Sequence, residues 1–373
     1  MTTSGEGASP RPRNMFATEW LRGCGEACDV VLSSRVRMAR NLAGFPFVVK
    51  ATRADRLQIL DACKRRIQVA HLASDIIWIN LHETTSMERT LLVERHLVSQ
   101  QHARGKLSTG AGGPDEPRAL AFSHPDERLA IMVNEEDHLR IQVIRSGLAL
   151  VEAMAEIDAV DDRLEGGLDY AYSQRFGYLT SCPTNVGTGV RLSVMLHLPA
   201  LRLTGDIDKA KQAANDMALA VRGFYGEGSQ AAGDFYQISN QTTLGKTESV
   251  LLHDLQREIL PQVIEYERSA RARLLTKRRA EIEDQVWRAM GTLRHAKLMT
   301  TEEAMQLLSL VRLGVVTGIV PGLSLAEVNS LLLAIQPMHL QRVVGKELDQ
   351  DKRRWVRADV LRERLADARG NGG

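Results

Sequence analysis

The chain has 373 residues, 44% of them hydrophobic and 25% charged, which is the balance of a globular protein large enough for two domains. A formal net charge of +2 is too small to indicate a nucleic-acid-binding protein, and no apolar run approaches the roughly 20 residues of a membrane span. Four cysteines at irregular spacing suggest neither a disulfide framework nor a zinc site, so we expect a reducing, cytoplasmic setting.

The first segments predict a tail followed by a strand that carries two arginines. Residues 1–28 begin as a polar stretch without an apolar signal core, and we expect a partly disordered N-terminal tail. From Asp29 to Arg40 the chain begins as a strand, in which Arg35 and Arg37 share a face because they are two residues apart. Two guanidinium groups on one face can hold a polyanion, although a solvated strand edge is the simpler alternative.

Helical periodicity over residues 52–73 and an apolar run over residues 75–82 predict a helix and then a strand. A second helix is predicted over residues 87–98, and it carries His96. A single histidine in a helix is more often a surface or core residue than a ligand. The local pattern alone therefore gives His96 no function.

An acidic cluster follows the strand predicted at residues 129–133. Glu135, Glu136 and Asp137 stand in succession, with a histidine and Arg140 beside them. Carboxylates this close raise one another's pKa values, so the cluster favours a nearby cation, either a metal ion or a guanidinium group. A solvated acidic turn is the alternative. Residues 141–144 resume a strand, and residues 147–162 predict an amphipathic helix.

The stretch of residues 177–198 is predicted to form a strand edge, a polar loop and a second strand. The loop holds Cys182, which the following proline biases towards an extended backbone. Two glycines and then Arg191 follow it. A thiol, exposed backbone N–H groups and an arginine suggest a site for an anion and a nucleophile-sized group. The alternative is an ordinary hairpin with a buried cysteine.

Residues 207–221 predict a helix that leads into a glycine-rich segment at residues 222–229, which we interpret as a loop able to close on a ligand. A strand follows at residues 235–239. The segment NQTTLGKT (240–247) lacks the first glycine of a phosphate-binding P-loop, so we interpret Thr247 as the cap of the next helix.

Beyond Thr247 the chain is predicted to be helical to its end. A long charged stretch over residues 248–290 has Pro261 as its expected kink, and its basic run at residues 271–279 is expected to be a solvated face. Further helices are predicted at residues 301–313, 324–335 and 349–369. Strands before about residue 245 and helices after it place a domain boundary near residue 250.

Five segments resemble motifs of the guanidino kinases, also called phosphagen kinases: SSRVR (33–37), NEEDHLR (134–140), GYLTSCPTNVGTGVR (177–191), RGFYGEGS (222–229) and ISNQTTLGKTE (238–248). The likeness covers nearly the whole chain from Asp29 onward, and several long motifs in one order make it specific. Within the family the chain is most similar to the bacterial protein-arginine kinases. The small-molecule enzymes carry an additional helical domain before the first motif, whereas this chain has a helical segment at its C-terminal end.

The resemblance implies an α+β fold, with a phosphagen-kinase-like catalytic domain (an antiparallel sheet flanked by helices) followed by an all-helical C-terminal domain. We place the catalytic domain at residues 29–250. The helical domain, expected to serve regulation, dimerisation or substrate binding, takes residues 251–373.

The implied activity is transfer of the γ-phosphoryl group of ATP to the guanidinium of arginine residues in proteins, which marks them for stress response or degradation. One alternative is a small-molecule guanidino kinase. The other, from a different class, is a non-catalytic adaptor that binds phosphoarginine proteins.

The resemblance also implies the roles of individual residues. Catalysis falls to Glu136, Glu227, Cys182 and Arg191: the two carboxylates orient the acceptor guanidinium and take its proton, and the thiol lies beside it. ATP binding falls to a larger set that matches the nucleotide motifs, namely Ser33, Ser34, Arg35, Val36, Arg37, His96, Arg140, Arg191, Leu192, Ser193, Val194, Met195, Arg222, Gly223, Phe224, Tyr225, Gly226 and Glu227.

ATP and Mg²⁺ are the implied substrate and cofactor. Mg²⁺ would bridge ATP oxygens, with the acidic cluster contributing through water, and no residue is assigned as a direct metal ligand. The implied partners are arginine-bearing proteins, an activator protein, a Clp-type protease or chaperone, and a second copy of the chain in a homodimer. Neither nucleic acid nor a membrane is expected as a partner.

The C-terminal segment departs from the family pattern at one position. Protein-arginine kinases have an Arg-Asp-x-x-Arg-Ala motif that binds phosphoarginine. The matching residues here are Arg353, Arg354, Arg357 and Ala358, so that Arg354 replaces the acid. A basic residue attracts the phosphate but repels the guanidinium part of the ligand. Regulation by phosphoarginine is therefore an open question at the level of sequence.

Overall fold

The computed structural model describes residues 18–106, 112–217, 219–224, 233–241 and 243–366. A short 3₁₀ turn, Glu19–Leu21, precedes the first strand. In the described residues an eight-stranded sheet runs in the spatial order β2-β3-β4-β5-β1-β8-β10-β9, and all of its neighbouring strands are antiparallel. The strands are β1 (Val31–Arg40), β2 (Ile76–Asn80), β3 (Ala119–Ser123), β4 (Leu129–Val133), β5 (Leu139–Ser146), β8 (Val190–His197), β9 (Leu219–Gly223) and β10 (Phe235–Asn240).

The first strand of the chain, β1, occupies the middle of the sheet. It pairs with β5 on one side, from Ser33 opposite Ser146 to Arg40 opposite Leu139. On the other side it pairs with β8. Both neighbours come much later in the sequence, so the centre of the sheet is built from distant segments. A two-stranded ribbon of β6 (Tyr172–Ser173) and β7 (Gly177–Tyr178) lies outside this sheet.

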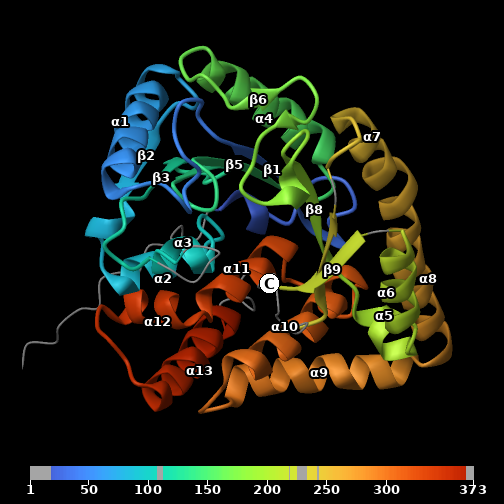
Figure 1. Cartoon of the computed structure of the whole chain (residues 1–373). Helices are drawn as coiled ribbons and strands as arrows, with labels where there is room; N and C mark the ends of the chain where they lie inside the picture. Colours follow the sequence, from blue (N-terminus) through green and yellow to red (C-terminus); the bar gives the residue numbers. More distant parts are fainter. Residues whose placement is uncertain (1–17, 107–111, 218, 225–232, 242, 367–373) are drawn as a thin grey trace, which may run out of the picture.

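Helices of the first 250 residues cover the sheet and its edges (Figure 1). The helix α4 packs on β1 and β5, and α1 packs on β4. Capping boxes begin α1 at Thr52 and α2 at Thr85, where the threonine hydroxyl accepts from a backbone N–H three residues on. The helices are α1 (Arg53–Val69), α2 (Ser86–Glu94), α3 (Gln100–Arg104), α4 (Leu150–Glu165), α5 (Pro199–Thr204) and α6 (Ile207–Asp216).

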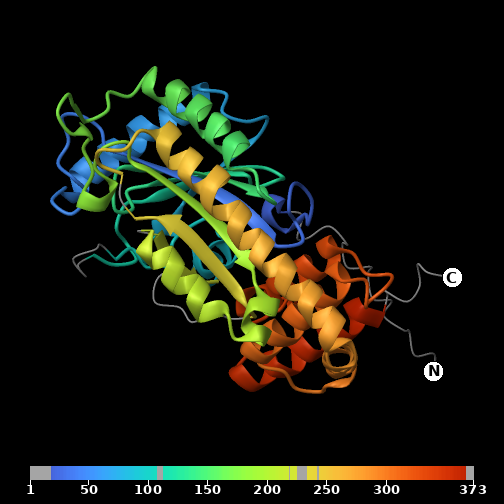
Figure 2. The same ribbon diagram turned by 90° about the vertical axis from the view of Figure 1, so that its right-hand side faces the viewer.

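The described residues after residue 247 form helices only. These are α7 (Glu248–His253), α8 (Leu260–Lys277), α9 (Arg279–His295), α10 (Thr301–Val316), α11 (Leu325–Ala334), α12 (Pro337–Val344) and α13 (Gln350–Ala366). We call the group α9–α13 the helical region. Figure 2 shows α8 running along the molecule from the sheet to this region. Thr247 caps α7 by accepting from Val250 N–H, as the sequence predicts.

The α+β fold expected from the sequence is confirmed, with an antiparallel sheet and a helical C-terminal part. One apolar cluster runs from the sheet into the helical region, since Leu196 and Phe235 belong to the same cluster as Met305 and Leu308. The domain limits at residues 28 and 250 stay a prediction, and the core passes through the second of them.

A buried polar network joins α10 to the start of the sheet. The guanidinium of Arg312 donates to the carbonyls of Cys28 (2.7 Å) and Asp29 (3.0 Å), to Asn329 Oδ1 (3.1 Å) and to His197 Nδ1 (2.8 Å). On the neighbouring helix Arg271 pairs with Glu267, which in turn accepts the N–H groups that begin α5. The expectation of a solvated basic face at residues 271–279 is therefore wrong for Arg271, which is buried.

Several predicted elements differ from the observed ones. The predicted helix over residues 207–221 ends at Asp216, and the edge strand β9 takes the rest of it. Helix α12 had no counterpart in the sequence analysis. A π-helical turn, Asp254–Ile259, stands where the kink was expected, and Pro261 follows it in the first turn of α8.

Candidate functional site

Five arginines gather on one face of the sheet because of its register. Arg35 and Arg37 alternate along β1, as the sequence predicts, and Arg37 stands directly opposite Arg191 of β8. Arg140 of β5 stands opposite Ala39, and Arg222 of β9 is opposite Gln237 of β10. Residues opposite one another in neighbouring strands point to the same side. This face, which we call the arginine face, is the one that α4 does not cover.

The alternate residues of the same strands point to the opposite face. Ser34, Val36, Leu192 and Val194 are fully buried in the core. The Ser34 hydroxyl donates to Gly147 O (2.8 Å) and accepts from Ala149 N–H (2.9 Å), so it holds the start of α4. The sequence assignment took consecutive residues as ATP-binding, but in a strand only every second side chain reaches one face. The side chains of Ser33, Ser193 and Met195 do lie on the arginine face.

The crowding of positive charge shows in the pKa values of the arginines. Burial, together with the charges of Arg140, Arg191 and Arg222, lowers the pKa of Arg35 to about 10. Burial and the neighbouring guanidinium groups lower the pKa of Arg37 well below its usual value. Buried Nε of Arg37 has no hydrogen-bond partner. A polyanion placed here would relieve the repulsion and supply the missing acceptor.

The acidic loop between β4 and β5 does not hold three equivalent carboxylates. Glu135 is buried, accepts from Arg140 Nη1 at 2.8 Å and accepts the Ser99 hydroxyl at 2.7 Å. Burial alone would raise the pKa of Glu135, but Arg140 and its hydrogen bonds bring it to about 2. Glu135 is therefore ionised and fixes Arg140. The cation that the sequence analysis expected is, for this residue, a guanidinium.

Asp137 has a different role in the same loop. Its Oδ1 accepts from Asn41 Nδ2 at 2.6 Å and from Ser181 N–H at 2.7 Å. Ser181 precedes Cys182, so Asp137 joins the acidic loop to the loop that carries the thiol. Glu136, between these two residues, lines the large cavity described below, as they do.

Cys182 stands at the end of the arginine face, before the 3₁₀ turn Pro183–Asn185. Its backbone is extended (φ −97°, ψ 124°), as expected for a residue before proline. Its Sγ lies 3.0 Å from Thr184 Oγ1, and its carbonyl accepts the Thr180 hydroxyl at 2.8 Å. The residue is partly accessible, so Cys182 is not the buried cysteine of the alternative.

A cavity of about 820 Å³ lies over the arginine face. Arg35, Arg37, Arg140, Arg191 and Arg222 line it, and Glu136 and Cys182 also border it. It is large enough for a drug-sized ligand. A row of cations therefore leads to a carboxylate and a thiol within one open space.

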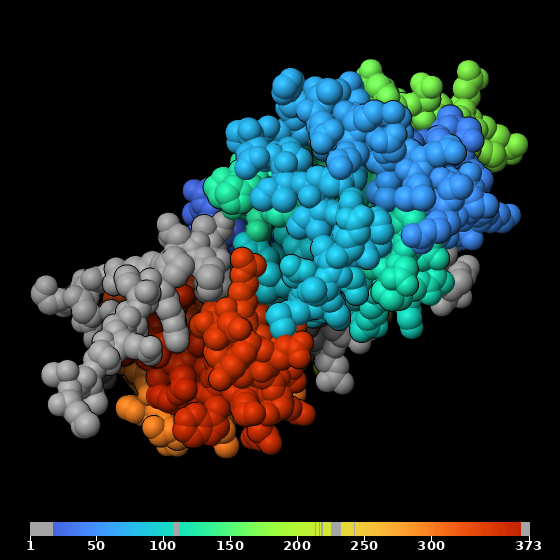
Figure 3. Space-filling view, turned by 90° about the vertical axis from the view of Figure 1, so that its left-hand side faces the viewer, coloured from blue at the N-terminus to red at the C-terminus, as the bar shows by residue number. Residues whose placement is uncertain are grey.

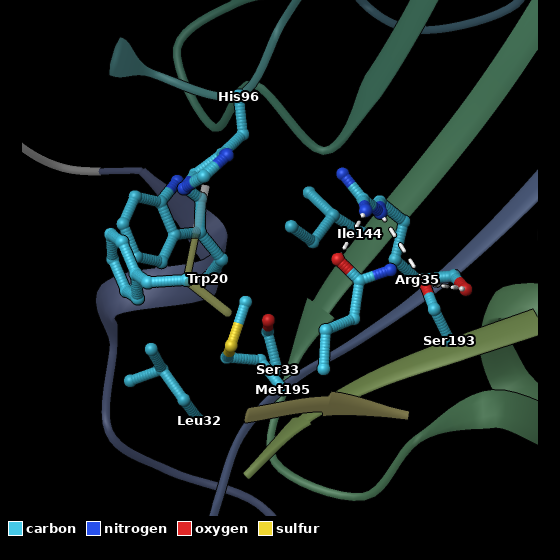
Figure 4. A pocket seen from close by; sticks show the side chains of 10 residues that line it. Trp20, Leu32, Ser33, Arg35, His96, Ile144, Ser193 and Met195 are labelled. Atoms are coloured by element: carbon cyan, nitrogen blue, oxygen red, sulfur yellow. Dashed lines mark hydrogen bonds between the residues drawn. The ribbon is translucent and has the colours of Figure 1, made fainter. Parts of the chain in front are cut away.

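A smaller pocket of about 60 Å³ adjoins the cavity, and Figure 4 shows how its walls are arranged. His96 and Trp20 stack edge to face on one side, with ring centroids 4.8 Å apart. Phe224 is 5.6 Å from the His96 ring. On the other side Arg35 donates to Ser193 Oγ (3.4 Å) and Gln237 Oε1 (3.1 Å). Aromatic walls beside a row of guanidinium groups suit a nucleoside attached to phosphates.

His96 is not on a helix, contrary to the sequence prediction. Helix α2 ends at Glu94, and His96 has a left-handed backbone with φ 61°. Burial, and then the charge of Arg35, lowers the pKa of His96 to about 3. The imidazole is therefore neutral at physiological pH and acts in the wall as a flat apolar ring.

The sequence analysis missed Trp20, which stands in the predicted tail, and the neutral residues Gln237, Ser239 and Gln142. Ser239 accepts from Arg191 Nη2 at 3.2 Å, and Gln142 donates to His96 O at 2.8 Å. The two-residue alternation of β10 and β5 would have placed them on the arginine face once the register was known. Tyr225, Gly226 and Glu227 lie outside the described residues, whereas Gly223 ends β9.

The C-terminal segment that resembles a phosphoarginine motif lies on α13. Arg357 and Ala358 are buried, and Arg357 donates to Ile335 O (2.8 Å) and Met299 O (2.9 Å). Arg354 is partly exposed, with Asp351 3.8 Å away. Arg353 also lies on this helix. One of the two motif arginines that match thus supports the helical fold itself.

The described part of the chain contains neither a candidate membrane-spanning helix nor a candidate metal site. Its helices include none with the length and apolar character needed to cross a membrane. Those same residues hold no group of three or more His, Cys, Asp or Glu side chains placed to bind a metal ion.

Two family profiles match the chain. Residues 59–270 match the ATP:guanido phosphotransferase C-terminal catalytic domain, and residues 279–372 match the C-terminal domain of the protein-arginine kinase McsB. Among curated proteins, a protein-arginine kinase of Symbiobacterium thermophilum is 45% identical over 94% of this chain and 97% of its own length. One of Halothermothrix orenii is 42% identical over the same shares of the two chains.

Solved structures with a similar fold include two guanidino kinases. A lombricine kinase matches with a TM-score of 0.55 and 25% identity, over 67% of this chain and 69% of its own. The duplicated taurocyamine kinase of Schistosoma mansoni, with bound transition-state-analogue components, has the same TM-score and identity over 64% of this chain and 33% of its own.

Proposed function

The chain belongs to the ATP:guanido phosphotransferase family and, within it, to the protein-arginine kinases, and from this premise we propose which of its residues carry the reaction. Its activity is the transfer of a phosphoryl group from ATP to arginine residues of proteins. The observation that carries the assignment of roles is the common face of the five arginines, between an aromatic pocket and Glu136 with Cys182.

ATP is proposed to lie along the arginine face. The adenosine enters between Trp20, His96 and Met195, and the triphosphate follows the row of guanidinium groups towards Glu136. Planar guanidinium groups bind phosphate oxygens through two parallel hydrogen bonds, which positions the γ-phosphorus as well as neutralising its charge.

The acceptor guanidinium is proposed to meet Glu136 at the far end of the row. A guanidinium nitrogen forms the new N–P bond as the bond between the γ-phosphorus and the β,γ-bridging oxygen breaks, and ADP leaves. The nitrogen loses one proton in this step, and the Glu136 carboxylate is the group we assign to receive it. A free guanidinium has a pKa above about 12, so the carboxylate orients the nitrogen first and takes the proton only as the N–P bond forms.

Negative charge accumulates on the transferred group and on the leaving ADP, and fixed cations stabilise it most effectively where water is excluded. Arg35, Arg37, Arg140, Arg191 and Arg222 are proposed to do this. Cys182 would lie beside the acceptor guanidinium. Glu227 is kept as the second acceptor carboxylate on the family resemblance alone.

Mg²⁺ is proposed as the cofactor, held chiefly by ATP. Glu135 is bonded to Arg140, and Asp137 to Asn41 and Ser181, so neither offers a whole carboxylate to a metal ion. Mg²⁺ commonly keeps several waters and binds substrate phosphates with one or two carboxylates, and such an arrangement fits this loop. The ion would neutralise phosphate charge, while the residues of the chain orient the two substrates.

One assay tests the function. Purified protein is incubated with Mg-ATP and either casein or free arginine, and acid-labile phosphate and phosphoarginine are measured by mass spectrometry. Phosphoarginine on casein, with little phosphate transferred to free arginine, is the expected result. Faster transfer to free arginine would indicate a small-molecule guanidino kinase, and binding of phosphoarginine proteins without transfer would indicate an adaptor.

The remaining proposals rest on the family resemblance. They are a homodimer, an activator protein, a Clp-type protease or chaperone as partner, a cytoplasmic location, and the marking of proteins for stress response or degradation. Phosphoarginine regulation through α13 is an additional proposal, weakened by Arg354 and by the bonds that Arg357 already makes. Light scattering of the purified protein tests the dimer directly.

A further inference from the structure

The end of α2 is bound to the start of α12, across the boundary between the sheet and the helical region. The carboxylate of Glu94 accepts the backbone N–H groups of Met338 (2.9 Å) and His339 (3.1 Å). It also accepts from His339 Nδ1 at 2.7 Å. Both side chains are buried: the exposed fraction is 8% for Glu94 and 1% for His339. Figure 3 shows the surfaces of the two segments in contact.

Glu94 takes the place of a cap that α12 does not supply itself. The residue before α12, Gln336, makes no capping bond with its side chain, and Pro337 occupies the first turn. The first N–H groups of a helix lack partners within it and carry partial positive charge, so a carboxylate there is stabilising. Ile335, which precedes Gln336, is also held, because Arg357 of α13 donates to its carbonyl oxygen. The start of α12, which Glu94 binds, is thus also linked to α13.

The residues that follow Glu94 form one wall of the nucleoside pocket. Arg95 binds both oxygens of Glu127, at 2.8 and 2.9 Å from its Nε. His96 then adopts its left-handed backbone in the turn that ends α2, where its N–H donates to Val93 O at 2.9 Å and the N–H of Leu97 donates to Leu92 O at 3.0 Å. Gln142 also holds this turn, because its side-chain amide donates to His96 O. Glu94, just before this turn, links it to the helical region through its bonds to Met338 and His339.

The opposite wall depends on the helical region too. Trp20 belongs to the 3₁₀ turn Glu19–Leu21, and Asn329 of α11 donates to Leu21 O at 3.5 Å. Two residues later Gly23 passes so close to α11 that a Cβ atom there would stand 2.8 Å from Leu325 Cβ. Both rings that meet at 4.8 Å, His96 and Trp20, therefore stand on segments docked against α11 and α12.

We propose that Glu94 is a positioning residue through which the helical region sets the affinity for ATP: by binding the start of α12 it holds His96 at the correct place against Trp20. The inference rests on the proposed place of the nucleoside. It assigns the helical region a part in nucleotide binding without any contact between that region and ATP.

The alternative is that the contact between Glu94 and α12 stabilises the fold but leaves nucleotide binding unaffected. The full-length protein is compared in four forms: the parent, Glu94→Gln, which keeps the shape but removes the charge, Glu94→Asp, which keeps the charge, and His339→Ala. Glu88→Gln is the matched control, because the Glu88 carboxylate caps α2 itself by accepting from Thr85 N–H and Oγ1, both at 2.9 Å. ADP binding is measured by calorimetry, and kcat and KM for ATP with casein as acceptor.

The expected result is a rise in Kd for ADP and in KM for ATP on the order of tenfold for Glu94→Gln, with kcat within about twofold of the parent. Glu94→Asp should retain part of the affinity, and Glu88→Gln all of it. Adding His339→Ala to Glu94→Gln should give much less than the product of the single effects, because both remove one interaction. If Glu94→Gln does not fold, Glu94→Asp and His339→Ala are judged by the same measurements.

Unchanged affinity in Glu94→Gln, an equal effect in Glu88→Gln, or multiplicative effects in the double variant would each overturn the proposal. His96→Ala separates this failure from failure of the proposed function. If His96→Ala weakens ADP binding and the Glu94 variants do not, the nucleoside site stands and the positioning role falls. If His96→Ala also leaves binding unchanged, the nucleoside has been placed wrongly.

Discussion

At the scale of single residues, three neighbouring carboxylates have three different surroundings. Glu135 is neutralised by Arg140, and Asp137 joins the acidic loop to the backbone of Ser181. All three line the large cavity, and Glu136 is the one we assign to meet the acceptor. The repulsion that adjacent carboxylates would suffer is thus avoided because two of them are bonded to donors of the protein.

We expect the Glu136→Gln variant to lose phosphoryl transfer while it keeps its affinity for the nucleotide. The amide has the shape of the carboxylate but cannot accept the proton or attract the guanidinium, so kcat should fall on the order of 10²-fold or more with Kd for ADP unchanged. The measurement is single-turnover transfer to casein together with ADP calorimetry. Glu152→Gln, exposed on α4, is the control and should behave as the parent. Turnover near the parental rate in a folded Glu136→Gln would remove Glu136 from the reaction.

The sequence predicted some of these residues better than others, for a physical reason. Alternation along a strand is local, so the common face of Arg35 and Arg37 follows from their spacing alone. Trp20 could not be found, because its place depends on packing against residues some 300 positions away, such as Asn329. The sequence alone could not say how Glu135 and Asp137 are bonded, since their partners Ser99 and Ser181 are distant in the chain.

At the scale of elements, α10 joins the helical region to the sheet through one side chain. Arg312 satisfies two backbone carbonyls before β1, one imidazole nitrogen and one amide oxygen, all within 3.1 Å. A buried acceptor left without a donor costs about 1–3 kcal/mol, so this single guanidinium prevents several such costs.

Replacing Arg312 with lysine should therefore destabilise the protein although the charge is kept. An ammonium group has three donors in a compact head and cannot reach four acceptors arranged around a planar fork. We expect a loss of about 3 kcal/mol or more in the free energy of unfolding, measured by urea denaturation. Arg288→Lys on α9 is the matched control, because its side chain is 77% exposed and pairs with Asp284 on the surface. Equal stability of the two variants would contradict the role given to Arg312.

Strong local patterns predicted most elements, including β4 at its observed limits and the cap of α7 at Thr247. The failures share one cause. The edge strand β9 follows an alanine-rich helix, and it is a strand because β10 offers it a partner. Helix α12 lacks a cap of its own and is completed by Glu94. Tertiary contacts decide both elements, and they leave no trace within a short window of sequence.

At the scale of the whole molecule, buried neutral histidines make stability depend on pH. Burial lowers the pKa of His102 from 6.5 to about 4, and it lowers the pKa of other buried histidines, namely His96, His138, His197 and His339. Below about pH 6.5 the unfolded chain binds protons that the folded chain does not, so each such histidine loses its stabilising contribution as the pH falls towards its folded pKa.

His102→Gln isolates one of these contributions. The parent should lose about 2 kcal/mol more stability than this variant between about pH 7 and about pH 5, because the glutamine does not titrate. A glutamine amide can also replace the bond that His102 Nε2 makes with Ala119 O at 3.0 Å. Urea denaturation at the two pH values measures the difference. Parallel losses in both proteins would mean that folding does not lower the pKa of His102.

The central position of β1 has a consequence for how the protein is made. Ribosomes add roughly 5–20 residues per second, so the 283 residues that separate Asp29 from Arg312 take roughly 15 to 60 s to emerge. Until β5 and β8 have been synthesised, the nascent chain presents Val30, Val31 and Leu32 without the partners that later bury them. Of the described strands β1 is thus the first to leave the ribosome and among the last to be fully enclosed, and it is where a chaperone that recognises apolar strands would act during translation.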